Sequence, residues 1–210
     1  VPKEVPAYIV NQVCGSGIRA VTSGFQSIKA GDSKIIISGG QENMSLAPHA
    51  IHLRDGKKLG DTELIDTMIK DGLWDAFHGY HMGITAENVA EKWNISREDQ
   101  DNFATTSQSK AQEAIKNKKF KDEIIDGLLL EDEHPRKDVT IETLSKLKPA
   151  FKENGTVTAG NSSGINDGAA AVLLMKREEA ERRNLKTLAK IVSWATCGVD
   201  PALMGSGPIP

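Results

Sequence analysis

The stretch that decides the fold reads Asn11-Gln12-Val13-Cys14-Gly15-Ser16-Gly17. An apolar run over residues 7–13 predicts a strand, and a helical pattern over residues 17–30 follows the two glycines. This order places a thiol at a strand-to-helix turn, where N–H groups and the helix dipole stabilise an anion. Glycines there allow a sharp turn and close approach by a substrate. Taken alone, the cysteine is explained equally well as a small buried hydrophobe, so the rest of the chain has to decide.

Composition limits the class of protein. The chain has 210 residues, 39% apolar and 26% charged, which is typical of a globular protein with one large domain or two small ones. The net charge of -3 gives no reason to expect a nucleic acid or an anionic membrane as partner, and no apolar run is long enough to span a membrane. Cys14 and Cys197 do not indicate a disulfide framework, so we expect a reducing, cytoplasmic compartment.

Residues 34–38, Lys-Ile-Ile-Ile-Ser, are typical of a buried parallel strand. Together with the strand expected at 7–13 and the helix at 17–30, which Gly31 would end, they predict a right-handed β-α-β unit. Cys14 would then lie at the carboxyl edge of a parallel sheet, where ligands usually bind.

Residues 44–155 differ in composition from the rest of the chain, with all five histidines and several short helical patterns. Residues 84–93 predict one helix, and Ser96 with Asp99 predicts a capping box at the start of the next. We interpret this region as an insertion that covers the sheet.

The sheet pattern resumes near residue 156. In chain order we expect an extended segment at 157–159, a turn-rich loop at 160–168 in which Asn166 and Asp167 hold a turn, and a buried strand at 169–175, although its alanines also permit a helix. A short polar helix at 178–184 and a further strand at 188–196 follow. The mixture of strands and helices predicts an α/β protein.

Several separate motifs carry a resemblance to a known family. In chain order they are Asn11 to Gly17, Ser38-Gly39-Gly40-Gln41-Glu42-Asn43-Met44-Ser45, Asp71-Gly72-Leu73, His81-Met82-Gly83, Ala86-Glu87-Asn88, Lys146-Leu147-Lys148-Pro149, Gly155-Thr156-Val157-Thr158-Ala159-Gly160-Asn161 and Gly164-Ile165-Asn166-Asp167-Gly168-Ala169-Ala170-Ala171. Through them the chain resembles the thiolases, and among these the biosynthetic acetyl-CoA acetyltransferases, from about Tyr8 to its last residue.

The resemblance implies the thiolase fold, an α/β fold of two similar halves stacked in α/β/α/β/α layers, with a loop domain inserted into the first half. Only part of that fold would be present here. Residues 1–43 and 156–185 would belong to the N-terminal half, 44–155 would be the inserted loop domain that covers CoA, and 186–210 would begin the C-terminal half. Within the loop domain, residues 49–67 resemble the segment that pairs dimers into a homotetramer.

A chemistry for Cys14 is implied as well. Its thiolate would attack the thioester of acetyl-CoA and carry the acetyl group, which splits one hard condensation into two easier steps. A second acetyl-CoA would lose a proton from its methyl carbon and attack this acetyl group, giving acetoacetyl-CoA; the reverse reaction is thiolysis. Preorganised donors would have to stabilise the developing oxyanions. Coenzyme A is substrate and product, and no other cofactor is expected.

Further site residues follow from the resemblance, position by position. They are His81, Met82 and Met204 at the pantetheine and acyl region, Ala150, Phe151, Ala159 and Ser163 along the pantetheine tunnel, and Leu73 and Arg136 near the adenine end of CoA. Considered without the family, Met82 and Met204 are equally suited to filling core space, and Arg136 to a solvated surface. His78 and His81 lack further ligands at suitable spacing, so no metal is expected.

Three thiolase motifs do not occur in the chain: Asn-Glu-Ala-Phe, the Gly-His-Pro of the catalytic histidine and the Cys-Ile-Gly-Gly-Gly of the second cysteine. The family's first strands are missing too, so the chain resembles the middle of a thiolase. Without the groups that complete the site, a nucleophile loses most of its rate advantage, and we expect residues 1–210 alone to be inactive. Residues 126–131 are also shorter than the family's usual stretch before Arg136.

Two other functions remain open. The first is another enzyme of the superfamily, either a longer-chain 3-ketoacyl-CoA thiolase or a β-ketoacyl synthase; the synthases lack the motifs at His81 and at Gly164. The second is a non-catalytic CoA-binding remnant, against which the intact Cys14 motif argues. Activity on acetoacetyl-CoA compared with longer substrates distinguishes the thiolases, and an acetyl adduct on Cys14 distinguishes enzyme from remnant.

Overall fold

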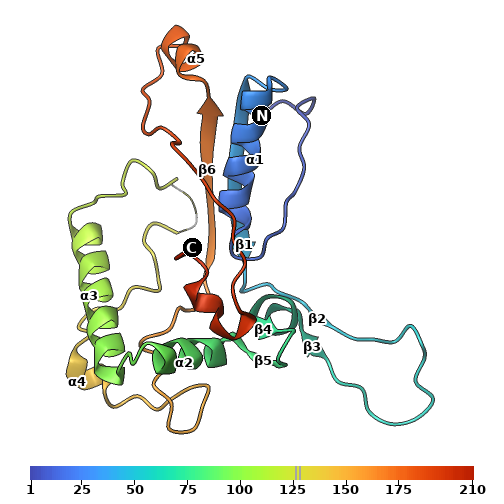
Figure 1. Cartoon of the computed structure of the whole chain (residues 1–210), viewed down its shortest axis with the longest axis vertical. Coiled ribbons are helices and arrows are strands. Elements are labelled where there is room, and N and C mark those ends of the chain that lie inside the picture. The colour runs from blue at the N-terminus through green and yellow to red at the C-terminus, as the bar shows by residue number, and fades with distance from the viewer. Residues whose placement is uncertain (126, 128) are drawn as a thin grey trace. The chain divides into compact units, whose positions relative to one another are not determined.

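The computed structural model describes residues 1–125, 127 and 129–210, and this part of the chain forms two compact units (Figure 1). The first unit consists of residues 1–47 and 166–196. The second consists of residues 48–165 and 197–210. Cys14 belongs to the first unit, and the other predicted site residues belong to the second.

The first unit is a two-stranded antiparallel sheet with a helix against it. Its elements are α1 (Ser16–Ala30), β1 (Ile35–Asn43), β6 (Asp167–Met175) and α5 (Arg177–Arg182). The strands pair from Ile35 opposite Met175 to Asn43 opposite Asp167, and Figure 1 shows α1 running alongside them. The predicted helices at 17–30 and 178–184 are confirmed within one or two residues at each end, and so is the end of α1 at Gly31, which has a left-handed φ of 91°.

Close contact between α1 and the sheet depends on a glycine. A Cβ at Gly24 would lie 2.7 Å from Ser38 Oγ and 2.9 Å from Leu174 Cδ1, so only a residue without a side chain fits there. The Ser38 hydroxyl donates to the carbonyl of Ala20 at 3.1 Å, which joins helix and strand. This packing fixes the middle of α1 relative to β1.

Three expectations for this unit are wrong. Residues 7–13 and 188–196 form no strand, and β1 pairs with β6 antiparallel rather than with a parallel neighbour. A strand needs a ladder of hydrogen bonds to a partner, and within the described residues neither run has one, whereas β1 finds its partner more than 120 residues later. Cys14 therefore does not lie at the edge of a parallel sheet.

The strand predicted at 169–175 is present as β6 but is mostly exposed, with Leu173 52% exposed, because α1 covers a single face of the pair. Asp167 does not hold a turn as expected. It begins β6, and its carboxylate accepts hydrogen bonds from the N–H and hydroxyl of Ser45. The Ser45 hydroxyl, and after it the Ser45 N–H, lower the pKa of Asp167. The same two bonds connect the end of β1 to the start of β6.

The second unit is mainly helical. Its elements are β2 (His49–Ala50), β3 (Ile65–Asp66), η1 (Met68–Leu73), β4 (Trp74–Asp75), β5 (Tyr80–His81), α2 (Met82–Lys92), α3 (Arg97–Lys116), α4 (Ile141–Leu144) and η2 (Pro201–Ser206). The predicted helix at 84–93 is α2, and the predicted capping box is confirmed. The N–H of Asp99 donates to Ser96 Oγ at 3.1 Å, and the N–H of Ser96 donates to Asp99 Oδ2 at 3.0 Å.

No helix among the described residues is both long enough and apolar enough to cross a membrane. In the same part of the chain, no three histidine, cysteine, aspartate or glutamate side chains gather as metal ligands would. The segment at 126–131 cannot be compared with the sequence expectation, because residues 126 and 128 lie outside the described residues.

Candidate active site

Cys14 lies in a tight turn that local hydrogen bonds hold together. The N–H of Gly15 donates to the carbonyl of Gln12 at 3.0 Å, and that of Ser16 to the carbonyl of Val13 at 3.1 Å. The Ser16 hydroxyl accepts from the N–H of Gln12 at 2.8 Å and donates to the carbonyl of Val13 at 2.6 Å. These bonds close the turn at the start of α1 and leave the Cys14 side chain exposed.

The residue before the cysteine adopts an unusual backbone conformation. Val13 has a φ of 49°, in the left-handed region that a β-branched residue rarely occupies. Such a conformation costs about 1–3 kcal/mol and persists only where surrounding bonds impose it. Here Ser16 and Asn11 impose it, since the Asn11 side chain also accepts from the N–H of Val13 at 2.9 Å. Strain next to a thiol at a helix start resembles the nucleophile elbow of serine hydrolases.

The turn opens onto a hollow of about 380 Å³ in the first unit. Glycines and aliphatic side chains dominate its lining, which consists of Cys14, Gly17, Ile18, Val21, Ser38, Gly39, Gly40, Ala170, Ala171 and Val172. Gly39 lies so close to β6 that a Cβ there would collide with the carbonyl oxygen of Ala170. In the part of the chain that the structure describes, this lining offers a thiol and one hydroxyl but no carboxylate, imidazole or amine.

His81 holds the start of α2 in the second unit. Its Nδ1 accepts the N–H of Gly83 at 3.0 Å as the helix N-cap, so in this state the ring is neutral and carries its proton on Nε2. Burial lowers the pKa of His81, which favours the same state. His81 also pairs with Trp74 between β5 and β4, and this places Leu73, the last residue of η1, one position from that pair.

Phe151 packs directly against this helix start. Its ring stacks on the imidazole of His81, with centroids 4.7 Å apart and planes 16° from parallel. The contact requires a glycine at position 83, because a Cβ there would collide with the Phe151 ring. Met82, which follows His81 as the first residue of α2, is half-buried. The structure thus brings two of the predicted residues, His81 and Phe151, into contact, and a third, Met82, follows His81 in the chain.

The loop at residues 148–163, called here the 148–163 loop, carries four predicted site residues. It folds back on itself through a bridge between Pro149 and Thr158, and the N–H of Ala150 donates to the carbonyl of Val157 at 2.9 Å. A surface hollow of about 420 Å³ is lined by residues 148–154, which include Ala150 and Phe151. Ala159 and Ser163 follow with exposed side chains.

Two buried carboxylates support the 148–163 loop. Asp101 on α3 is 2% exposed and accepts from Asn161 Nδ2 at 3.0 Å and from Arg97 Nε at 2.8 Å. Glu87 on α2 is 5% exposed and accepts from the backbone of the loop. Burial acts to raise the pKa of Glu87, but the N–H groups of Val157 and Thr156 outweigh it, so the pKa lies below its usual range.

The supporting roles of Glu87, Asp101 and Asn161 were not predicted from the sequence. Glu87 and Asn161 occur inside the quoted motifs but received no role there, and Asp101 was not considered. A signal was available, because a carboxylate at the helix position occupied by Glu87 falls on the buried side of α2, beside Gly83 and Ala90. An acidic residue on an apolar face indicates a buried partner.

The remaining two predicted residues lie at the edges of this unit. Met204 lies in η2, which packs against α2 through a bond from Asn88 Nδ2 to the carbonyl of Ala202 at 3.0 Å; the Met204 side chain is 42% exposed. Arg136 has an exposed side chain, and its N–H donates to Gln108 Oε1 on α3 at 3.0 Å.

Comparison with known proteins decides the family. The thiolase N-terminal domain matches residues 1–178 of the chain. The chain belongs to the thiolase family. It is 58% identical over 218 aligned residues to an acetyl-CoA acetyltransferase of Rhizobium meliloti (strain 1021), and 53% identical over 221 aligned residues to a cytosolic acetyl-CoA acetyltransferase of Mus musculus. Each alignment covers 100% of this chain and 56% of the relative, so the chain spans about half the length of these thiolases.

A solved structure confirms the thiolase fold. The human mitochondrial 3-ketoacyl-CoA thiolase in complex with CoA is similar with a TM-score of 0.95 and 41% sequence identity. The match covers 100% of this chain and 54% of the human chain, so the present chain contains part of the fold, as expected.

Proposed function

We propose that this chain contributes the nucleophile and the CoA-side surface of an acetyl-CoA C-acetyltransferase. The observation that carries the proposal is the Cys14 turn: an exposed thiol at the start of a helix, beside a strained residue and above a hollow, in a chain of this family. Relatives named acetyl-CoA acetyltransferase support the substrate.

In the proposed reaction the Cys14 thiolate attacks the carbonyl carbon of acetyl-CoA, and the CoA thiolate leaves and takes up a proton. An S-acetyl-cysteine remains on the protein. The methyl carbon of a second acetyl-CoA gives up a proton to a base, which balances the proton taken up by the departing CoA thiolate, and the carbanion attacks the acetyl carbonyl. Sulfur leaves as the thiolate, acetoacetyl-CoA forms, and the cysteine is regenerated. Run backwards, the same steps cleave acetoacetyl-CoA with CoA.

The second unit would supply the surface for CoA. His81, Met82 and Phe151 form its centre, Ala159 and Ser163 continue along the 148–163 loop, and the other assigned residues are Leu73, Ala150, Arg136 and Met204. Two lysines, Lys148 and Lys152, line the hollow of this loop and would attract phosphates. We infer that CoA acts as substrate and product, with no further cofactor or metal.

The test is intact-protein mass spectrometry of the whole protein that contains this chain, after exposure to acetyl-CoA. An added acetyl group on Cys14 supports the enzyme, and Cys14→Ser should lose it. Cys197→Ser is the matched control, because Cys197 is the other exposed cysteine and should leave the adduct unchanged. Tight binding of CoA with no adduct on the unsubstituted protein would instead support a CoA-binding remnant.

A longer-chain 3-ketoacyl-CoA thiolase is the second candidate, and the similarity to the human 3-ketoacyl-CoA thiolase favours it. The two relatives named acetyl-CoA acetyltransferase have higher identities and favour the short substrate. Comparing kcat/KM for thiolysis of acetoacetyl-CoA and of a longer 3-ketoacyl-CoA decides between them.

We also propose a cytoplasmic homotetramer for the whole protein. The β2 and β3 strands carry between them a stretch with exposed apolar side chains, including Leu59 at 92% and Leu64 at 65%, which suits an interface between copies. The relative named cytosolic supports the compartment. Light scattering on the whole protein tests the assembly, and Leu59→Lys should reduce its mass if residues 49–67 join the subunits.

A further inference from the structure

We propose that Glu87 is a positioning residue, whose carboxylate holds the 148–163 loop in the conformation that receives the pantetheine arm of CoA. The proposal rests on the CoA-dependent function above and assigns to Glu87 no contact with the substrate. The proposal rests on three observations: four hydrogen bonds to Glu87, a glycine next to it where no side chain would fit, and a contrast with the neighbouring Glu91.

The hydrogen bonds come from a segment about 70 residues away in sequence. The N–H of Thr156 donates to both Oε1 and Oε2 of Glu87 at 2.9 Å, its hydroxyl donates to Oε2 at 2.9 Å, and the N–H of Val157 donates to Oε1 at 2.9 Å. Two successive backbone N–H groups pointing at one carboxylate fix the direction of the chain at that point.

The loop is shaped to receive this carboxylate. A Cβ at Gly155 would collide with Glu87 Oε1, so the residue before the two donors has no side chain. Val157 is 7% exposed and Glu87 is 5% exposed, which keeps water from competing for the donors. A carboxylate buried in this way is stable because hydrogen bonds replace its hydration.

The position of Glu87 in the chain connects these bonds to the site. Met82 lies five positions before Glu87 on the same helix. Next to Met82 is Gly83, against which the ring of Phe151 from the loop packs. Three and seven positions after Thr156 are Ala159 and Ser163. Glu87 therefore joins α2 to the backbone of the loop between its two groups of proposed CoA-surface residues, in addition to the contact of Phe151 with the start of α2.

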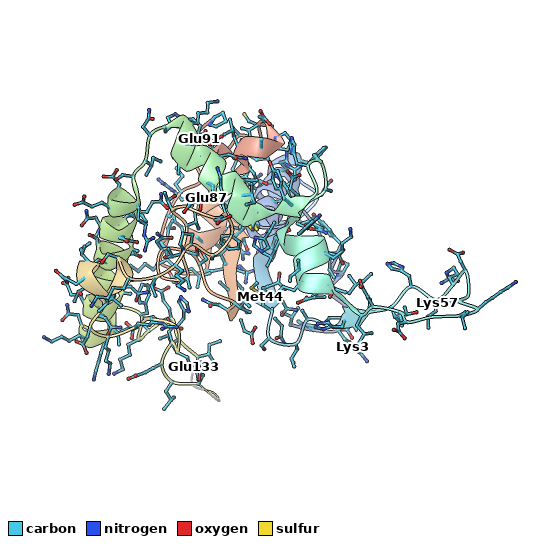
Figure 2. All side chains as sticks on the ribbon, turned by 90° about the horizontal axis from the view of Figure 1, so that it is seen from below. Lys3, Met44, Lys57, Glu87, Glu91 and Glu133 are labelled. Carbon is cyan, nitrogen blue, oxygen red and sulfur yellow. The ribbon has the colours of Figure 1, made fainter. Side chains whose placement is uncertain are left out.

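A second glutamate on α2 provides the contrast (Figure 2). Glu91 is one helical turn further along, and its side chain is 78% exposed. Its one ion pair, with Lys152 Nζ at 3.8 Å, joins two exposed groups and contributes little. Glu87 and Glu91 thus offer the same side chain on the same helix, the first bonded to backbone N–H groups of the loop and the second only to the exposed side chain of Lys152.

The experiment compares Glu87→Gln with Glu91→Gln in the whole protein, by steady-state thiolysis and by hydrogen exchange. A glutamine keeps the volume but turns an NH₂ group toward N–H donors. We expect Glu87→Gln to raise the KM for CoA about tenfold with kcat within about twofold, since loss of a bond to a charged acceptor is of that size. The amides of Thr156 and Val157 should exchange faster. Glu91→Gln should change neither.

A milder variant guards against loss of folding. Thr156→Val removes the hydroxyl, which donates to Glu87 and accepts from Gln100 Nε2 at 2.9 Å, and keeps the β-branched shape and both N–H groups. The KM should rise about two- to threefold, with a smaller loss of stability than in Glu87→Gln. Equal KM values for wild type, Glu87→Gln and Thr156→Val would overturn the proposal. A fall in kcat at unchanged KM would overturn it too, since the loop would then act on the reaction rather than on binding.

Failure of the proposed function is recognised separately. If the unsubstituted protein shows no turnover but binds CoA in calorimetry, the proposed acetyltransferase activity is wrong. The CoA affinities of Glu87→Gln and Glu91→Gln then still test the role of Glu87. A weaker affinity in Glu87→Gln alone supports the positioning role. If the unsubstituted protein neither turns over nor binds CoA, both proposals fail.

Discussion

Two regions that hold predicted site residues, the Cys14 turn and the 148–163 loop, are built in opposite ways. The Cys14 turn is closed by bonds between residues two to four positions apart, and its thiol faces a hollow of glycines and aliphatic side chains. The 148–163 loop is held by bonds that reach 60 to 70 positions back, to Asp101 and Glu87, and both carboxylates are buried.

This difference separates two tasks. A short turn can present a reactive group wherever it lies in the fold, because its geometry is complete within six residues. A binding surface made from a helix and a distant loop needs a tie between them, and buried carboxylates with several donors provide a directional one. Changes at Cys14 should therefore affect chemistry, and changes at Glu87 should affect stability and binding.

The largest expected effect concerns the Cys14 hollow. Since its described lining contains no general base, residues 1–210 expressed alone should turn over acetoacetyl-CoA about 10²–10⁴-fold more slowly than the whole protein, the usual contribution of acid–base groups. The spectrophotometric thiolysis assay measures it. Circular dichroism of the isolated chain serves as the check that it folds. Turnover equal to that of the whole protein would show that the hollow is sufficient by itself.

Next in size is the loss of the Glu87 side chain. Glu87→Ala leaves the N–H groups of Thr156 and Val157 buried without an acceptor, so the free energy of unfolding should fall by about 2–4 kcal/mol. Glu91→Ala, at an exposed position, should stay within about 0.5 kcal/mol of wild type. Urea unfolding of the whole protein gives both values, and equal losses for the two variants would contradict the contrast between them.

What the sequence could predict follows the same division. Patterns within a few residues were enough for α1, α2 and the capping box at Ser96, because helix periodicity and caps are local. The runs at 7–13 and 188–196 look like strands, yet a strand depends on a partner that no local pattern supplies. Helix periodicity could place Glu87 on the buried face of α2, but its partners could not be predicted, since its donors lie 69 and 70 positions away.

A smaller effect is expected where the loop meets the start of α2. Gly83→Ala should force Phe151 away from His81 and lower the free energy of unfolding by about 1–3 kcal/mol, the usual cost of overpacking. Gly72→Ala is the matched control, because a Cβ there meets nothing within 4 Å. Thermal unfolding compares the two variants. A stable Gly83→Ala protein would mean that the stacked pair can move without cost.

Acid should weaken the tie at Glu87 in a defined direction. Its pKa is lowered in the folded state from an ordinary value of 4.5, so its stabilising contribution is complete above that value and is lost as the pH falls through the folded pKa. The difference in unfolding free energy between wild type and Glu87→Gln should thus be constant from pH 8 to about 6 and shrink below about 4.5. A difference that grows on acidification would contradict this assignment.

The smallest expected effect concerns the cap of α3, the helix that carries Asp101, and it tests whether the Cys14 turn works independently of the second unit. Ser96→Ala removes one half of the capping box and should lower the free energy of unfolding by about 1 kcal/mol, with acetylation of Cys14 unchanged. Ser16→Ala also removes a serine hydroxyl near a helix start, but that hydroxyl bonds to Gln12 and Val13 in the turn itself. It should slow acetylation of Cys14, measured by mass spectrometry over time. If Ser96→Ala slowed acetylation as much, the reactivity of Cys14 would depend on the stability of the helices of the second unit, and the local turn would not be sufficient to present the thiol.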